Sequence, residues 1–207
     1  VLNYLLLLGW APEGEQEIFS LDEMIKIWDP ARISKSPAIF DPLKLRAINA
    51  AYIRALPAEE FRKLADPFID QAVHVQIDRD LLCANLQPRC EVLEDIPPQL
   101  DFFDAVLPID AEMYRNKKQK TTPESAKEAL SALLPVLEAQ TDWSRDAIFE
   151  ACKQKAEAME KKNGWLLFPL GIALSGKART PGGGTDLAAM MGKEETLRRL
   201  NAAIEAL

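Results

Sequence analysis

The stretch from Trp165 to Leu174 is the feature that most restricts how this chain can fold. It is an apolar run that ends at Gly176, and it is surrounded by sequence of helical character. A membrane-spanning helix needs about 20 apolar residues, and this run is far shorter. We therefore expect it to be a buried anchor in the core of a folded domain.

A basic, glycine-rich loop follows this anchor. It contains Lys177, Arg179 and three successive glycines at 182–184, and Asp186 then opens a final helical segment. Glycines allow positive φ angles and a close approach of the backbone to a bulky partner, and a basic pair suits a phosphate. The alternative is a flexible connector. The loop is the first candidate for a binding element.

Helix start signals recur along the chain, while no segment alternates polar and apolar residues as a strand would. Ser20 and Glu23 form a capping-box pair, and Ser144 can cap another helix. Proline supplies a preset first-turn φ in three further places, which are Asp41-Pro42, Pro57-Ala58 and Thr122-Pro123. The pattern predicts an all-α fold.

Two details of this helical pattern are more specific. Prolines at 67, 88, 97, 98 and 108 predict short helical pieces separated by turns between residues 66 and 108. The helix that Ser144 caps is expected to be closed by Asn163-Gly164, because such a pair is typical of a helix end. A single last helix is expected to place Leu197, Leu200, Ile204 and Leu207 on one face.

Composition points to a cytoplasmic globular protein. The chain has 207 residues, of which 48% are hydrophobic and 28% charged. No basic segment precedes Tyr4–Leu8, as a secretory signal would require. Leu2–Leu8 resembles the tail of a helix without a start signal, so we expect that an amino-terminal part is missing. We also expect a monomer.

Residues for catalysis or metal binding are scarce. His74 is the only histidine, and no phosphate-binding glycine loop is present. Cys83, Cys90 and Cys152 lack the close spacing of a zinc site, and we expect buried, reduced thiols. The sequence predicts no catalytic residue, no metal site and no cofactor in this chain.

The positive charge is clustered although the formal net charge is −7. An acidic chain is a poor indiscriminate binder of nucleic acid, but a local basic face is compatible with binding. The clusters all follow residue 110 and comprise Arg115–Lys120, Lys153 with Lys155, Lys161-Lys162, Lys177 with Arg179, and Arg198-Arg199.

Several motifs occur in the order of one enzyme family. They are Asn3-Tyr4-Leu5 with Leu8-Gly9-Trp10, Ile18–Ile25, Arg32–Asp41, Pro169–Gly176 and Gly192–Leu200. In this order and spacing the chain resembles the carboxy-terminal half of bacterial glutamyl-tRNA synthetases, which are class I aminoacyl-tRNA synthetases. The resemblance is strong over residues 3–54 and 164–204 and looser between them.

The resemblance implies a parent protein that joins glutamate to tRNA with ATP and Mg²⁺. The catalytic domain of that family carries a His-Ile-Gly-His-like and a Lys-Met-Ser-Lys-Ser-like signature ahead of the Asn-Tyr-Leu motif. Ile33–Ser36 imitates the second signature but follows Asn3–Leu5, so we interpret it as a separate block. The chain alone is therefore expected to be inactive.

The resemblance also implies three helical regions. Residues 1–63 would form a connector that touches the inner side of the tRNA, and 64–118 and 119–207 would form two anticodon-binding subdomains of the α-helical cage type. Anticodon bases are read on aromatic or arginine planes, while lysines hold the backbone. The candidate tRNA-binding residues are Arg32, Lys35, Tyr114, Arg115, Lys117, Lys118, Trp143, Lys177 and Arg179.

One departure from the family pattern concerns selectivity. Many relatives have Pro-Leu-Arg where this chain has Pro169-Leu170-Gly171, and the loop over 180–185 is extended. The expected partner is tRNA(Glu), and the sequence leaves open whether tRNA(Gln) is also charged. The alternative function is a helical protein–protein interaction module without tRNA specificity.

Overall fold

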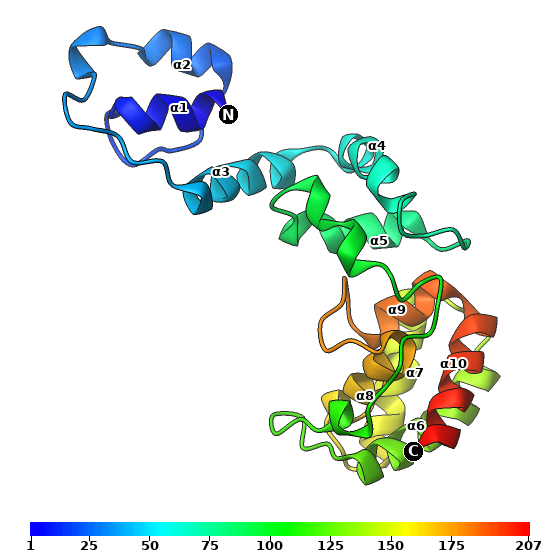
Figure 1. Ribbon diagram of the computed structural model, residues 1–207. Coiled ribbons are helices and arrows are strands. Elements are labelled where there is room, and N and C mark those ends of the chain that lie inside the picture. Colours follow the sequence, from blue (N-terminus) through cyan, green and yellow to red (C-terminus); the bar gives the residue numbers. More distant parts are fainter.

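The computed structural model describes residues 1–207 and is built from helices alone (Figure 1). Ten α-helices are joined by turns and short 3-10 helices, and the only β-type pairing consists of two isolated bridges. The all-α prediction is confirmed. No helix combines the length and the apolar character needed to cross a bilayer.

The amino-terminal region packs around the Asn-Tyr-Leu motif. Its elements are α1 (Leu2–Gly9), α2 (Leu21–Ile27), the 3-10 helix η1 (Pro30–Arg32) and α3 (Pro42–Ala55). The buried Asn3 side chain donates to the Glu17 carbonyl at 2.8 Å and accepts from the Phe19 N–H at 2.9 Å. The Tyr4 hydroxyl accepts from the Asp41 N–H at 2.7 Å. These two side chains fix the segments that enter α2 and α3.

The predicted helix starts are confirmed. Ser20 and Glu23 form a full capping box at α2, and the Asp41 carboxylate accepts from the first two free N–H groups of α3. Thr122 caps the helix that begins at Pro123, and Ser144 caps the one that begins at Arg145. Local side-chain chemistry therefore sets where these helices begin.

The middle of the chain is divided into short pieces, as the prolines predict. After α4 (Ala58–Ile69) come the following elements: α5 (Arg79–Leu86), η2 (Gln87–Arg89), η3 (Leu93–Asp95), η4 (Pro97–Gln99) and η5 (Ala111–Tyr114).

Pro67 is an exception because it lies inside α4. It stands close to the carboxyl end of the helix, where few backbone hydrogen bonds are left to lose. Phe61, Ala65 and Ile69 recur every four residues and are fully buried, so packing of this face holds the helix through the proline.

The carboxy-terminal bundle forms around the apolar anchor. Its helices are α6 (Pro123–Ala139), α7 (Arg145–Ala158), α8 (Asn163–Ser175), α9 (Gly184–Met191) and α10 (Lys193–Ala206). Helix α8 contains the whole apolar run and packs against the other four. Gly176 ends α8 with a φ of 65°, a left-handed conformation that favours glycine. The predicted buried anchor is confirmed.

Two predicted boundaries in this bundle are wrong. Helix α7 ends at Ala158, and Asn163-Gly164 opens α8 instead of closing α7. The predicted single last helix is divided into α9 and α10 at Gly192. Glu160 has a φ of 54° and Gly192 a φ of 80°, and a right-handed helix cannot continue through either conformation.

One hydrophobic core extends from Ile53 to Ala203 and therefore joins α3 through α10. The predicted division of the chain into three regions, with boundaries after residues 63 and 118, stays a prediction. Cys83, Cys90 and Cys152 are buried, free thiols, as expected. Burial raises the pKa of the first two to about 11 and that of Cys152 to about 12.

A buried arginine joins the middle of the chain to the last helices. The Arg199 side chain is 1% exposed and donates to the carbonyls of Phe102, Phe103 and Leu174 at 2.6, 2.9 and 2.7 Å. Its Nε donates to the Glu195 carboxylate at 2.5 Å. This guanidinium fixes the segment after η4 against α8 and α10.

We expect Arg199→Met to lower the free energy of unfolding by about 3–5 kcal/mol, because three buried carbonyls and Glu195 lose their donor. Urea unfolding monitored by circular dichroism measures the loss. The matched control is Arg198→Met, which removes an exposed partner of the same carboxylate and should cost less than about 1 kcal/mol. Equal losses in the two variants would contradict a central role for Arg199.

The same contacts predict a response to acid. Hydrogen bonds from Arg198 and then Arg199 lower the pKa of Glu195 from 4.5 to about 2. Because the folded pKa is the lower one, this stabilisation is complete above about pH 4.5 and is lost as the pH falls towards 2. Between these pH values the free energy of unfolding should fall less in Glu195→Gln than in the wild type. Parallel pH profiles of the two proteins would contradict this prediction.

Candidate nucleic-acid interface

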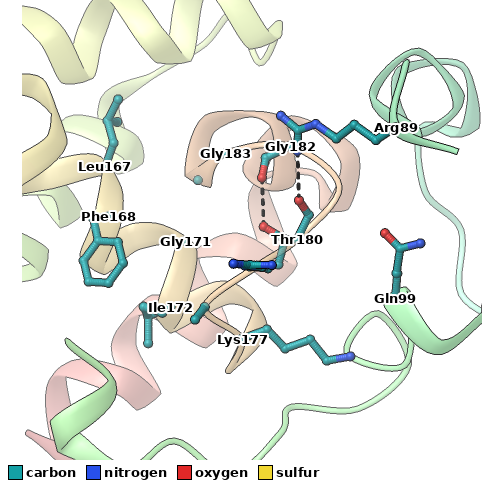
Figure 2. A pocket seen from close by; sticks show the side chains of 13 residues that line it. Arg89, Gln99, Leu167, Phe168, Gly171, Ile172, Lys177, Thr180, Gly182 and Gly183 are labelled. Carbon is teal, nitrogen blue, oxygen red and sulfur yellow. Dashed lines mark hydrogen bonds between the residues drawn. The ribbon is translucent and has the colours of Figure 1, made fainter. Parts of the chain in front are cut away.

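An open cleft of about 580 Å³ lies between the glycine-rich loop, α8 and the 3-10 helices η2 and η4 (Figure 2). Its lining residues come from the middle of the chain and from the carboxy-terminal bundle. They are Arg89, Gln99, Leu167, Phe168, Gly171, Ile172, Lys177, Ala178, Arg179, Thr180 and Gly182–Gly184.

The glycine-rich loop is held in place by its own polar groups. The Ser175 hydroxyl donates to the Gly171 carbonyl at 2.7 Å and accepts from the Lys177 N–H at 3.1 Å. Further along, the Thr180 hydroxyl donates to the Gly182 carbonyl at 2.8 Å. These bonds give the loop a defined path over the end of α8, unlike a free connector.

Glycine is required where α9 meets α8. A Cβ on Gly184 would lie 2.8 Å from the Leu167 carbonyl oxygen and 2.9 Å from the Gly171 nitrogen. Both are backbone atoms of α8, so neither can move without shifting the helix. A Cβ on Gly183 would meet only the Asp186 carboxylate, at 3.5 Å. The close approach of the two helices therefore depends on Gly184.

The cleft is positive although the chain is acidic. No carboxylate is among its lining residues, and Arg89 and Arg179 are exposed and form no ion pair. Arg89 makes only a 3.5 Å contact with the Thr180 carbonyl. Two free guanidinium groups in a shared hollow suit an anionic ligand with planar hydrogen-bonding groups.

Lys177 has a different role from the two arginines. Its ammonium donates to the Pro98 carbonyl at 3.0 Å and forms an ion pair with Asp101. It therefore joins the glycine-rich loop to η4 and forms a wall of the cleft.

The opposite wall of the cleft is apolar. Figure 2 shows Phe168 and Ile172 of α8 on one side and Arg89 and Gln99 on the other. An aromatic ring facing guanidinium groups is an arrangement on which an unstacked base can lie while its edges and phosphates contact arginine. The geometry is compatible with a splayed single strand.

Two of the nine predicted binding residues, Lys177 and Arg179, line this cleft. The structure places Arg32 elsewhere, where it pairs with Glu13 at 2.9 Å and lies over the Trp10 ring at 5.4 Å. Lys35 is exposed in the turn before α3 and has no ion pair. These two residues belong to a separate surface at the amino-terminal end.

The predicted aromatic residues have limited exposure. Tyr114 is 1% exposed, and burial raises its pKa to about 12. Trp143 is partly buried and donates its indole N–H to the Ala188 carbonyl at 2.9 Å. Tyr114 has no free face on which a base could stack in this structure.

The residues of the predicted basic run Arg115–Lys120 differ in whether they have an ion-pair partner. Arg115 is held by Glu112 through two hydrogen bonds of 2.6 and 2.9 Å. Lys117 and Lys118 are exposed at the tip of a turn. The structure thus leaves the two lysines, but not the arginine, free for a partner.

Three cleft residues were missed from the sequence, namely Arg89, Gln99 and Phe168. Arg89 and Gln99 lie 91 and 81 positions before Thr180 in the loop that they face, and no local pattern marks them. Phe168 lies in an all-apolar run, where it reads as core. No signal in the sequence could have assigned these residues, since tertiary packing brings them together.

The fold is all-α and has a basic cleft where its helical segments meet, which is an arrangement suited to binding nucleic acid. The comparison with protein families agrees with this conclusion. The model described as "Anticodon binding domain" matches residues 49–204. The chain belongs to this anticodon-binding domain family. The match includes every residue that lines the cleft.

Its curated relatives are named glutamate–tRNA ligases. The relative from Clostridium botulinum strain Hall is 44% identical over 207 residues, which is 100% of this chain and 43% of the relative. The relative from Clostridium acetobutylicum is 44% identical over 208 residues, with the same coverage. The chain thus spans less than half the length of these relatives.

Solved structures give the same result. The glutamate tRNA ligase from Elizabethkingia meningosepticum, determined in complex with its amino acid, is similar with a TM-score of 0.82 at 29% identity. The similarity extends over 100% of this chain and over 40% of the ligase chain. Glutamate-tRNA synthetase from Elizabethkingia anophelis has a TM-score of 0.79 at 27% identity.

The glycine contacts give a stability prediction. We expect Gly184→Ala to lower the free energy of unfolding by about 1–3 kcal/mol, because the added methyl group meets backbone atoms of α8. Gly183→Ala is the matched control and should change stability by less than about 0.5 kcal/mol. Thermal unfolding of both variants measures the difference. Equal stability would show that α9 and α8 can separate without cost.

Proposed function

We propose that this chain is the carboxy-terminal, anticodon-recognising part of a glutamate–tRNA ligase, and that it binds tRNA(Glu) as a monomer in the cytoplasm. The observation that carries the proposal is the cleft, where Arg89 and Arg179 lack ion pairs and no carboxylate intervenes. The family match and the names of the relatives support the choice of tRNA over other anions.

In this proposal the cleft takes unstacked bases of the anticodon loop. Phe168 offers a ring face, Arg89 and Arg179 offer donors to base edges or phosphates, and Lys177 keeps the loop against η4. The connector region would place Arg32 and Lys35 towards another part of the same tRNA. The boundaries 1–63, 64–118 and 119–207 remain part of the proposal.

Ligation of glutamate belongs to the proposed parent protein. The chain contains no group of three or more His, Cys, Asp or Glu residues placed to hold a metal ion. In this proposal ATP and Mg²⁺ are bound by the catalytic domain of the parent. The chain's own contribution is to bind and orient tRNA.

A second function, docking of another protein, is favoured by one observation. Twelve of the sixteen exposed large hydrophobic residues lie between Val1 and Leu43. An apolar hollow of about 470 Å³ opens there between α1, α2 and Trp28. Contiguous exposed apolar surface marks a protein contact. This surface is separate from the cleft, so variants of the cleft distinguish the two functions.

The central prediction concerns the two unpaired arginines. Arg89→Gln combined with Arg179→Gln should weaken tRNA(Glu) binding and reduce the slope of log affinity against log salt by about 1.4, since each lost phosphate contact contributes about 0.7 for single strands. Filter binding at several salt concentrations measures both quantities. Binding by the wild type should also weaken when the anticodon is changed.

The control for this double variant is Lys153→Gln with Arg198→Gln, which removes the same charge from cations that are paired with Glu150 and Glu195. It should leave the salt slope unchanged. If the cleft variant binds tRNA like the wild type, the protein-docking function becomes the better proposal.

Gly171 gives a test of selectivity. A Cβ at this position would lie 3.6 Å from the Gly184 nitrogen, which is an ordinary contact, and Gly171 lines the cleft. We therefore expect Gly171→Arg to fold and to bind tRNA(Glu) more tightly than the wild type. Gly171→Gln is the neutral control, and the ratio of affinities for tRNA(Glu) and tRNA(Gln) is measured for each protein. Weaker binding by the arginine variant would contradict the expected role of the position.

A further inference from the structure

The side-chain amide of Gln99 is fixed in one orientation at the edge of the cleft. Gln99 ends the 3-10 helix η4, and its Nε2 donates to the Asp95 carbonyl at 2.6 Å. The reverse orientation would turn the amide oxygen towards the Asp95 carbonyl oxygen, and neither oxygen carries a hydrogen to donate. The amide nitrogen therefore faces Asp95, and the amide oxygen is left for another partner.

The segment that carries Gln99 is held from two sides. On one side, the Asp95 carboxylate pairs with Arg46 of α3. On the other side, the Pro98 carbonyl accepts from the Lys177 ammonium at 3.0 Å. The amide oxygen of Gln99 is thus presented by a backbone that is already in place before a ligand binds, as a selective contact requires.

The free oxygen of this amide belongs to the cleft. Gln99 is exposed and lines the cleft, and its Oε1 accepts no hydrogen bond from the chain. Figure 2 shows the Gln99 amide with its oxygen, in red, on the side of the glycine-rich loop. The loop and η4 meet here because Lys177 contacts Pro98, the residue before Gln99. The cleft therefore has a hydrogen-bond acceptor on its η4 side.

The other polar side chains of the cleft offer mainly donors. Arg89, Lys177 and Arg179 line it, and such side chains have no acceptor. The Thr180 hydroxyl is engaged with the Gly182 carbonyl at 2.8 Å. An amide oxygen among guanidinium groups matches a base edge on which an amino group stands beside acceptor atoms.

Cytosine has an edge of this kind. Its exocyclic amino group donates, while the neighbouring ring nitrogen and carbonyl oxygen accept, which suits the fork of a guanidinium. Uracil has no amino group, and its one edge N–H stands between two acceptors. Glutamate codons begin with G and A, so an anticodon that pairs with them carries a cytosine and a uracil at the matching positions. A fixed acceptor can tell these two bases apart.

We propose that Gln99 is a specificity-determining residue, whose Oε1 accepts a hydrogen bond from the amino group of an anticodon cytosine in the cleft. This inference rests on the proposed function and adds base selection to it. Arg89 and Arg179 supply salt-dependent affinity through their charge, whereas a neutral amide contributes to the choice of base. Loss of the amide should therefore reduce selectivity without changing the salt slope.

The test removes the amino group and the acceptor separately. The probes are anticodon stem-loops of tRNA(Glu) that carry either cytosine or pyrimidin-2-one, which lacks the amino group, opposite the codon G. Wild-type protein should bind the second probe about three- to tenfold more weakly, the range expected for one hydrogen bond. Gln99→Met should bind both probes equally and keep the wild-type salt slope. Fluorescence anisotropy at several salt concentrations measures both quantities.

The matched control is Gln71→Met. The Gln71 amide also donates to a backbone carbonyl four residues earlier, that of Pro67 at 3.2 Å, but Gln71 does not line the cleft. This variant should keep the wild-type preference for cytosine over pyrimidin-2-one. Circular dichroism of both variants checks that each is folded.

Three results would overturn the inference. The first is an undiminished preference for cytosine in Gln99→Met, and the second is an equal loss of affinity for both probes, which a purely structural role would give. The third concerns a stem-loop methylated at the uracil N3. If Gln99→Met abolishes the response to that methyl group and not to the missing amino group, the amide reads uracil.

Failure of the proposed function gives a different result. In that case the wild-type protein would bind every stem-loop alike, whatever its anticodon. If the wild type instead distinguishes other anticodon changes but binds cytosine and pyrimidin-2-one equally, the role of Gln99 alone is wrong.

Discussion

The guanidinium of Arg199 is the interaction on which the carboxy-terminal architecture depends. It replaces water at the carbonyls of Phe102, Phe103 and Leu174, which belong to two different parts of the chain. A buried cation is costly unless its donors are satisfied, and here the Glu195 carboxylate also accepts from it. This geometry therefore specifies one relative placement of α8, α10 and the segment after η4, and the cleft lies between α8 and η4.

The cleft is basic because arginine and lysine side chains line it and no carboxylate does. Asp66 and Asp70 pair with Arg79, and Asp95 and Glu91 pair with Arg46. Near the cleft, Asp186 caps α9 and also pairs with Arg145. The local charge of the cleft thus depends on which side chains line it and not on the net charge of −7, which explains how an acidic chain presents unpaired arginines to a polyanion.

Helix α8 links stability with binding. One face places Leu166, Leu170 and Ala173 in the core, and another leads past Phe168 and Gly171 to the cleft. The close approach of Gly184 to Leu167 and Gly171 brings the backbones of α8 and α9 together, so the glycine-rich loop is positioned by the core itself. The cleft and the folded core therefore share this helix.

The sequence by itself determined the helices and the family. Caps at Ser20, Asp41, Thr122 and Ser144 and the apolar run of α8 act within a few residues, so their positions could be read locally. The ends at Ala158 and Gly192 could not, because a positive φ depends on packing. Only the tertiary structure decided that Arg89 and Phe168 join Arg179, that Tyr114 is buried, and that Gln119 lies against Gly164. Each of these depends on contacts between distant segments, and no local pattern encodes such contacts.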